Sequence, residues 1–285
     1  MQNKLVSIII PTKNASQLLP ACLQRIRRQS YKNVEIIVVD GKSPDWNKTK
    51  QIAKKYNCKF YTIFTKVKRG LYDATDKRNY GANLAKGEYI YHVDADMELT
   101  PNVIDEAVKL CDRGFDAVII PEDSFGVGPW ARAKNLERRF FWGDDTIESP
   151  RFFKKKAWDK LGGFDKKMGS AEDRDMHQRI LEAGYKVART KNMLMHNEGE
   201  LTLKQVFQKQ FRYKREILKY IQRRPLVGIK SYIPLRISHI VNWRMFASRP
   251  GDTFLLVIMK SVESFAGVLG ILCSLTIDKI SFFDK

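Results

Sequence analysis

Short apolar runs alternate with amphipathic stretches along the first part of the chain. Continuous apolar runs at Leu5–Ile10 and Val34–Val39 predict buried strands of the kind found in parallel sheets. Between them, Leu19, Cys22 and Ile26 recur at helical spacing and predict a helix. The alternation continues with a helix expected at residues 48–56, a strand at 59–64, a helix at 75–84 and a strand at 88–93. Strands and helices in this order predict an α/β fold with right-handed crossovers.

Polar residues follow three of these expected strands. Residues 12–14 come after the first strand, residues 40–45 after the second, and residues 94–96 after the fourth. Ligands of such sheets bind beyond the carboxyl ends of the strands, so these clusters predict a nucleotide site. The first strand runs into Pro-Thr-Lys-Asn rather than a Gly-x-Gly-x-x-Gly turn, which disfavours a dinucleotide-binding fold.

Two carboxylates stand one residue apart after the fourth strand, in His92-Val93-Asp94-Ala95-Asp96. Residues two apart in an extended segment point the same way, so Asp94 and Asp96 are expected to project together. Hard oxygen donors in this position suit Mg²⁺ or Mn²⁺ bridging a diphosphate. The alternative is a strand-end turn with solvated acids.

A second acidic group, Glu172-Asp173-Arg174-Asp175, opens another expected helix. Ser170 is expected to cap this helix and Gly184 to end it. Its buried face is expected to contain Met176, Ile180 and Leu181. The pattern places Asp173 in the first turn of a rigid element, as one of several acids that favour a helix N-terminus.

The segment from Ser124 to Pro150 contains several glycines and prolines and predicts a mobile loop near the site. Aromatic residues cluster in and beyond this segment. They are expected to shape an acceptor cleft, with burial in the core as the alternative, and they are Trp130, Phe140, Phe141, Trp142 and Trp158.

The charge of this 285-residue chain is uneven. The net charge is +19, and residues 204–249 alone hold twelve Lys or Arg residues against the single acid Glu216. The mostly apolar stretch Thr253–Ile277 follows directly. Lys260 and Glu263 interrupt this stretch three residues apart, where they can pair on one helix face.

Two charges within the apolar stretch argue against a spanning helix, which needs about 20 apolar residues. We expect instead an amphipathic or re-entrant helix at the membrane interface, with the basic segment on anionic lipid. A C-terminal helix buried against the core or a partner subunit is the alternative. Nucleic acid is disfavoured as a partner because no recognition motif accompanies the positive charge.

The compartment is predicted from the cysteines and from the start of the chain. Four widely separated cysteines without a Cys-x-x-Cys pair predict reduced thiols, and a strand-like run follows Lys4 where a secretory signal would lie. We expect a cytoplasmic protein, peripheral on the inner face of the cell membrane.

Taken in order, several motifs resemble those of family 2 glycosyltransferases of the GT-A fold. The resemblance covers roughly residues 4–200. The motifs are Ser7-Ile-Ile-Ile-Pro-Thr-Lys-Asn14, Glu35-Ile-Ile-Val-Val-Asp40, Lys77-Arg-Asn-Tyr-Gly-Ala82, Gly87-Glu-Tyr-Ile-Tyr-His-Val-Asp-Ala-Asp96, Gly162-Gly-Phe-Asp165, and Glu172-Asp-Arg-Asp175 through Arg179 to Gly184-Tyr185. One departure concerns the second strand, where Asp40 is followed by Gly41 instead of a second acid, so that Asp40 and Asp45 both stay candidates for contact with the base.

The resemblance implies a nucleotide-sugar site and a divalent metal, Mn²⁺ or Mg²⁺. The residues it implies for the nucleotide sugar are Pro11, Thr12, Asn14, Asp40, Arg78 and Asp94. For the metal it implies Asp96 directly, Asp94 on the ribose or through water, and His196. Alternatives are turn or N-cap roles for Thr12 and Asn14, a solvated helix face for Arg78 and a structural role for His196.

For catalysis the resemblance implies that Asp173 is the general base, ahead of Glu172 and Asp175, with His177 as a weaker candidate. The base would take a proton from the acceptor hydroxyl as its oxygen attacks the anomeric carbon, and a single displacement inverts the configuration.

These observations predict a GT-A type, Rossmann-like mixed sheet flanked by helices at residues 1–203. Residues 204–285 are expected to form a basic and apolar helical extension that associates with the membrane. The expected function is metal-dependent, inverting sugar transfer from a nucleotide-diphosphate donor to a hydroxyl acceptor such as a lipid-linked saccharide. The alternatives are transfer to polyprenyl phosphate, a nucleotidyltransferase, and a non-catalytic protein bound at the membrane surface.

Overall fold

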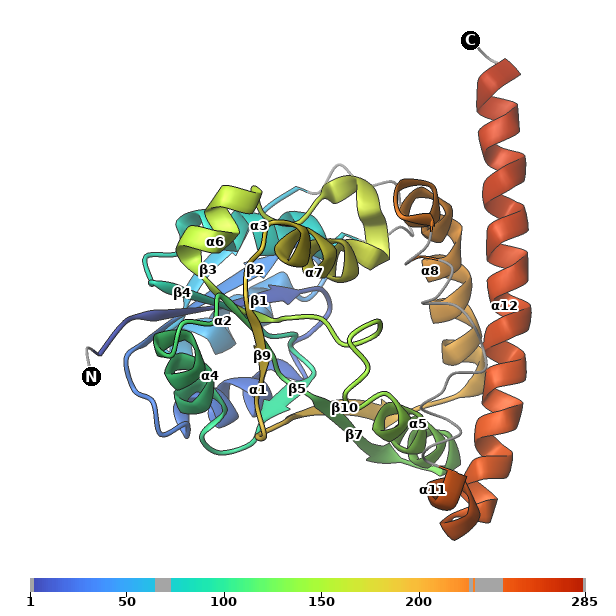
Figure 1. Ribbon diagram of the computed structural model, residues 1–285, viewed down its shortest axis with the longest axis horizontal. Helices are drawn as coiled ribbons and strands as arrows, with labels where there is room; N and C mark the ends of the chain where they lie inside the picture. Colours follow the sequence, from blue (N-terminus) through green and yellow to red (C-terminus); the bar gives the residue numbers. More distant parts are fainter. Residues whose placement is uncertain (1–2, 65–72, 226–227, 229–242, 284–285) are drawn as a thin grey trace.

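The computed structural model describes residues 3–64, 73–225, 228 and 243–283 (Figure 1). Part of the basic segment, residues 226–227 and 229–242, lies outside the described residues. Seven strands form a mixed sheet in the order β3-β2-β1-β4-β8-β6-β9. The strands are β1 (Val6–Thr12), β2 (Val34–Asp40), β3 (Lys59–Thr62), β4 (Tyr89–His92), β6 (Ala117–Ile119), β8 (Phe152–Lys154) and β9 (Val187–Arg189). The expected α/β sheet is confirmed.

Strand direction brings the predicted polar clusters to one edge of the sheet. β1 pairs in parallel with β2 on one side and with β4 on the other, while β8 runs antiparallel to β4. Along the chain, β2 and β3 are added on one side of β1, and β4 is then added on its other side. The carboxyl ends of β1, β2 and β4 therefore meet at this switch point of the sheet. The ends of these three strands and the loops that follow them carry the clusters at residues 12–14, 40–45 and 94–96.

The residue alternation along β1 builds two cores. Ile8 and Ile10 point toward one face of the sheet, and Ile9 points toward the other. Figure 1 shows α1 and α4 below the sheet and α3, α6 and α7 above it. The helices are α1 (Leu19–Arg27), α2 (Trp46–Lys55) and α4 (Val103–Asp112) against the first core, and α3 (Ala74–Leu84), α6 (Lys155–Leu161) and α7 (Glu172–Glu182) against the second.

The predicted loop at residues 124–150 is wrong over most of its length. The chain forms β7 (Glu122–Val127) and helix α5 (Pro129–Phe140) there. β7 lies in a second, three-stranded sheet with β5 (Met97–Leu99) and β10 (Leu194–Glu200), in the order β5-β10-β7. The glycines and proline that suggested mobility mark the junction, where Gly128 adopts φ +87° and Pro129 opens the helix.

The C-terminal part forms a helical hairpin along one side of the molecule (Figure 1). Helix α8 (Leu203–Arg223) begins at the predicted boundary between residues 203 and 204. After α11 (Trp243–Ser248), the long helix α12 (Pro250–Phe283) runs beside α8, and its carboxyl end projects beyond the rest of the chain. Gly267 and Gly270 allow this close contact, because an added Cβ at Gly270 would lie 2.5 Å from the carbonyl oxygen of Phe211.

The predicted pairing of Lys260 with Glu263 is confirmed, at 2.5 Å. This pair also binds two charges of α5, since Lys260 lies 2.7 Å from Glu137 and Glu263 lies 3.3 Å from Lys134. Leu256 and Met259 of α12 pack beside this four-charge cluster against Leu136 and Phe140. The charges that interrupt the apolar stretch thus dock α12 onto α5.

Gly81 sets the distance between α3 and the sheet. A Cβ at this position would lie 2.6 Å from Cγ2 of Ile9 and 3.3 Å from Cγ2 of Val39. Only glycine permits this approach, and Arg78, one turn earlier on α3, consequently lies above the strand ends.

We predict that Gly81→Val lowers the free energy of unfolding by roughly 1–3 kcal/mol, because the branched side chain overpacks the contact with β1 and β2. Gly251→Ala is the matched control, since nothing lies within 4 Å of its added Cβ. This control should change stability by less than about 0.5 kcal/mol. Urea unfolding of both variants measures the difference, and equal stabilities would contradict the close approach of α3.

Candidate active site

Thr12 and Asp40 are register partners at the ends of β1 and β2. The Thr12 hydroxyl donates a hydrogen bond of 2.8 Å to Asp40, whose other oxygen accepts from the Ser43 backbone at 2.7 Å. Asp40 is fully buried and Thr12 almost so. These bonds fix the turn after β2, so that Asp40 organises the edge of the sheet from within.

Asp45 and Asn14 lie at the surface of the same edge. Asp45 is partly exposed and accepts from the Ser16 backbone at 2.9 Å. Burial opposes its charge, but this bond and the Ser43 hydroxyl lower the pKa of Asp45. Asn14 is exposed, with a left-handed φ of +52°. The N-cap of α1 is Leu18, so the alternative that Thr12 or Asn14 caps this helix is wrong.

Asp94 lies between two arginines at the end of β4. Arg78 donates to one oxygen at 2.5 Å, and Arg151 donates to the other at 3.3 Å. Arg78 also donates to Glu172 at the start of α7. Burial alone would raise the pKa of Asp94, but the charges of Arg78 and Arg151 hold it well below its ordinary value. One arginine therefore joins the two acidic motifs.

Asp94 and Asp96 lie in a turn that the Met97 N–H closes by donating to the Asp94 carbonyl. Asp96 faces His196, whose Nε2 lies 3.2 Å from its Oδ2. The Nδ1 atom of His196 lies 2.7 Å from Arg138. The extended conformation expected for these residues is wrong, since β4 ends at His92 and the chain turns at Ala95 and Asp96.

A carboxylate and an imidazole together suit a divalent cation such as Mn²⁺. The Oδ1 atom of Asp96 is buried and has no hydrogen-bond partner among the described residues, so it is available to a ligand. No group of three His, Cys, Asp or Glu side chains lies together as a metal site in the described part of the chain. The residues present therefore fit a cation that takes its other ligands from a bound substrate.

Glu172 and Asp173 differ in exposure. Glu172 is buried against Arg78, whereas Asp173 is partly exposed and accepts from the Arg174 backbone at 2.7 Å. Burial works against the charged form of Arg151, yet neighbouring carboxylates that include Asp173 hold its pKa above the ordinary value. Asp173 therefore lies near Arg151, the arginine that also donates to Asp94.

Three details of the expectation for α7 are tested by the structure. The predicted Ser170 cap is wrong, because Ala171 is the N-cap and the Ser170 hydroxyl contacts the carbonyl of Tyr213 on α8 at 3.4 Å. The burial of Met176 and Ile180 is confirmed. Leu181 is 48% exposed, so its predicted burial is wrong. His177 is buried, and burial lowers its pKa.

Four charged residues of the site were missed from the sequence. Arg151 lies 2.6 Å from Glu122, Arg138 pairs with Glu122 as well, and Arg138 lies 3.0 Å from Glu198. A signal existed for Glu198, because it stands two residues after His196 on one strand and so shares its side. Of the other three, Arg138 lies in the segment that was predicted as a loop, and Glu122 and Arg151 lie just outside its two ends.

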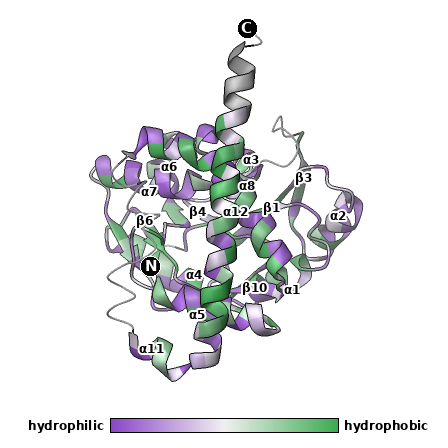
Figure 2. Ribbon diagram, turned by 90° about the vertical axis from the view of Figure 1, so that its right-hand side faces the viewer, coloured by the Kyte–Doolittle hydropathy of each residue, from purple (hydrophilic) through white to green (hydrophobic). Residues whose placement is uncertain are grey.

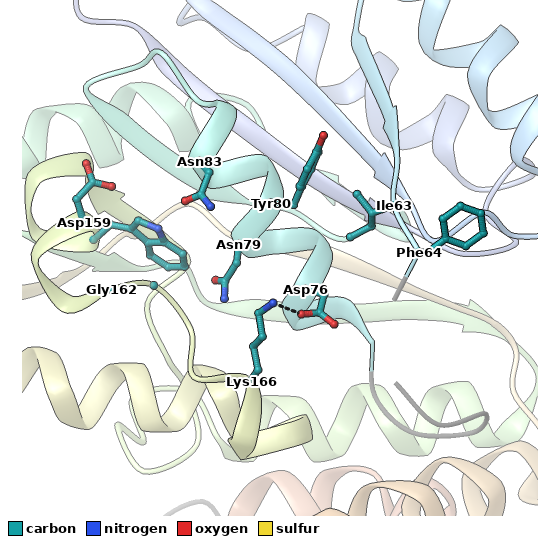
Figure 3. A pocket seen from close by; sticks show the side chains of 11 residues that line it. Ile63, Phe64, Asp76, Asn79, Tyr80, Asn83, Asp159, Gly162 and Lys166 are labelled. Atoms are coloured by element: carbon teal, nitrogen blue, oxygen red, sulfur yellow. Dashed lines mark ion pairs between the residues drawn. The ribbon is translucent and has the colours of Figure 1, made fainter. Parts of the chain in front are cut away.

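A separate cavity of about 840 Å³ lies beside α3 and α6 (Figure 3). Lys166 and Asp76 form an ion pair of 2.6 Å at its wall, and Asn79 connects it to the Gly163–Phe164 turn. None of the residues predicted for the nucleotide, metal or base lines this cavity. Trp158 packs in the core, as the alternative expected, and it also lines this cavity.

Comparison with protein families gives two matches. The model described as Glycosyl transferase family 2 matches residues 7–170, which include every predicted nucleotide-contacting residue. The model described as Glycosyl transferase family 21 matches residues 132–260, which include α8 and most of α5.

Two curated relatives illustrate the similarity. The putative colanic acid biosynthesis glycosyl transferase WcaA of Escherichia coli (strain K12) is 31% identical over 218 residues, 70% of this chain and 76% of that protein. The poly(ribitol-phosphate) beta-N-acetylglucosaminyltransferase TarP of Staphylococcus aureus (strain N315) is 26% identical over 171 residues. That alignment covers 55% of this chain and 51% of the relative.

Two solved structures share the fold. The mannosyltransferase PcManGT of Pyrobaculum calidifontis, in complex with GDP-Man and Mn²⁺, has a TM-score of 0.59 at 19% identity, covering 96% of this chain and 86% of that one. S. aureus TarS 1–349 in complex with UDP has a TM-score of 0.51 at 18% identity, covering 98% and 92%. The predicted mixed GT-A sheet flanked by helices is confirmed.

We predict that the site makes the protein sensitive to acid through Glu198. Burial opposes its charge, but His196 and Arg138 lower its pKa from 4.5 to about 2. Between these values the unfolded chain binds more protons than the folded chain, so the free energy of unfolding falls as the pH is lowered. Glu198→Gln should flatten this slope between pH 4.5 and 2. Urea unfolding at several pH values measures it, and an unchanged slope would contradict the lowered pKa.

Proposed function

Because the chain belongs to glycosyl transferase family 2, we propose that it moves a sugar from a nucleotide-diphosphate donor to a hydroxyl acceptor, with inversion at the anomeric carbon. One observation carries the proposal. Arg78 binds both Asp94 after β4 and Glu172 at the start of α7. The acid proposed for the donor side, Asp94, and the acid next to the proposed base, Glu172, therefore contact the same arginine. An arginine in this position can hold a diphosphate beside a base.

The donor nucleotide binds at the ends of β1 and β2 in this proposal, along Pro11, Thr12 and Asn14. Asp40 shapes this edge from its buried position through Thr12 and Ser43. Asp45 is the more exposed of the two candidate carboxylates, so it is the one that can accept a hydrogen bond from the base directly.

The donor diphosphate lies over Arg78 and Arg151, whose planar guanidinium groups suit phosphate oxygens. Asp94 holds both arginines and completes the nucleotide-sugar site. Asp96 and His196 are the residues that would hold the divalent cation, Mn²⁺ or Mg²⁺. When bound, the cation stabilises the negative charge of the departing nucleoside diphosphate.

Asp173 is the general base in this proposal. Its carboxylate is partly exposed, whereas that of Glu172 is committed to Arg78. Asp173 accepts the proton of the acceptor hydroxyl while that oxygen attacks the anomeric carbon. Glu172 acts as a positioning residue, because it orients Arg78 toward the donor.

The acceptor is a lipid-linked saccharide or glycan precursor at the cytoplasmic face of the membrane. The hairpin of α8 and α12 supports this placement, since it joins a basic helix to an apolar one. A base beside the site favours a hydroxyl acceptor over polyprenyl phosphate, whose oxygen is already ionised and needs no deprotonation.

We predict that Asp173→Asn lowers the turnover of sugar transfer roughly a hundred- to ten-thousandfold, because it removes the proton acceptor. Donor affinity should be unchanged. Glu182→Gln is the matched control on the same helix, since Glu182 lies on the surface near the carboxyl end of α7 and pairs only with Arg224 among the described residues. Normal turnover in Asp173→Asn would place the base elsewhere, and absent turnover in the wild type with every donor would favour a non-catalytic protein.

We also predict that one of UDP-, GDP- or dTDP-sugars raises the melting temperature in the presence of Mn²⁺, because binding stabilises the folded state by mass action. Asp96→Asn should remove the dependence of this shift on the metal. The released product should be a labelled nucleoside diphosphate, and pyrophosphate as the product would instead indicate a nucleotidyltransferase. A shift that is equal with and without Mn²⁺ would contradict the metal site.

A further inference from the structure

One face of α12 exposes an apolar stripe, which the exposed Ser261 interrupts. Its large hydrophobic side chains are between 47% and 67% exposed. They are Phe254, Val257, Phe265, Val268, Leu272 and Leu275. At 3.6 residues per turn these positions fall within an arc of about 80°. Figure 2 views the molecule from this side, with hydrophobic turns recurring along α12.

The other faces of α12 are covered by the protein itself. Leu256 and Met259 pack on α5, and Glu263 is buried in the four-charge cluster. Farther along, Gly267 lies against the Lys214 side chain and Gly270 against the backbone of α8. Between Leu256 and Gly270 the helix therefore has partners within the described chain on faces away from the stripe.

Cations and aromatic rings of α8 flank the stripe. The ring of Phe265 in the stripe lies 6.3 Å from that of Phe207 on α8, and Phe207 stacks on Phe211 at 6.3 Å. The guanidinium of Arg215 lies over Phe211 at 5.9 Å, and that of Arg212 lies over Tyr213 at 5.5 Å. Aromatic rings interleaved with arginines beside an apolar surface are typical of the boundary between lipid tails and headgroups.

We propose, on the basis of the proposed function, that this stripe is the surface that contacts an anionic lipid bilayer and that α12 lies along the interface without crossing it. The stripe enters the boundary of the acyl chains, and the α8 cations bind anionic headgroups. The same hairpin supports the base, because Glu216 of α8 packs on Gly169, just before α7. The hairpin proposed to contact the membrane thus packs directly on the segment that leads into the proposed base.

The neighbours of α12 favour a position of this helix in the plane of the membrane. Residues Pro250–Thr276 are long and apolar enough to cross a membrane by length and composition, but a third of that window is buried in the protein. Crossing would carry α8, with Arg212 and Arg215, into hydrocarbon, or else strip α12 from its contacts with α5. Charged side chains at the bilayer centre cost several kcal/mol each, so lying along the interface is favoured.

Charge also favours lipid over a second copy of this chain. Self-association through the stripe would bring two α8 helices together, and the segment that contains them carries twelve Lys or Arg residues against one acid. Anionic lipid headgroups neutralise these positive charges, so binding to lipid avoids the repulsion between two α8 helices.

The test measures binding of the full chain to phosphatidylcholine vesicles with and without phosphatidylglycerol. The wild type should sediment with the anionic vesicles and be released by salt. Phe265→Ser/Val268→Ser/Leu272→Ser should weaken this binding at least tenfold. Arg212→Gln should weaken it about fivefold and reduce its salt dependence. Val127→Ser, at a 68% exposed apolar residue on β7, is the matched control and should bind like the wild type.

Exchange between vesicle populations tests the in-plane position. A peripheral helix transfers from loaded to empty vesicles, whereas a spanning helix stays in place. Absence of vesicle binding, no effect of the triple substitution, or failure to exchange would each overturn the proposal. So would a wild-type dimer in solution that the triple substitution dissociates without changing vesicle binding. Nucleotide-sugar thermal shifts, measured without vesicles on the same proteins, report separately on the proposed function.

Discussion

A belt of alternating charges connects the elements on which the candidate site depends. It begins on α7, passes the end of β4 and continues to the second sheet and α5. In order of contact its members are Glu172, Arg78, Asp94, Arg151, Glu122 and Arg138, and Arg138 then contacts both Glu198 and His196. Removing charges from water is costly unless each one is paired, so a belt of this kind is stable only when all its segments are in place. Folding of the two sheets against each other and assembly of the site are therefore one event.

The belt also relates the C-terminal hairpin to the site. Glu137 and Arg138 are neighbours on α5 but face in different directions. Glu137 binds Lys260 of α12, while Arg138 binds His196 on β10. A second connection runs through Gly169, whose φ of +55° and contact with Glu216 leave no room for a side chain before α7. The hairpin is thus part of the support of the site, although the charge and hydropathy of the sequence make it look like an appendage.

Much of the first half could be predicted because its patterns are local. A buried parallel strand must be apolar over its whole length, and the residues that follow it must be polar, so β1, β2 and β4 were found together with Thr12, Asp40 and Asp94. The region at residues 124–150 failed for a related reason. Gly126 and Gly128 are typical of loops, but Gly126 is required because its neighbour, the Gly199 carbonyl, would lie 2.6 Å from a Cβ. That strand on the far side of the contact is distant in the sequence, so a local pattern does not reveal it.

The sequence by itself determined the order of the strands and helices up to β4, the edge of the sheet where the polar clusters gather, and the family, because each depends on residues within one element or motif. The tertiary structure alone decided which carboxylates are committed and which are available. Asp94 is held on both oxygens, Glu172 is held by Arg78, and Asp96 keeps a buried oxygen without a hydrogen-bond partner in the described chain. Such assignments depend on ion pairs between segments far apart in the chain, whose energies arise only when folding brings the charges together out of water.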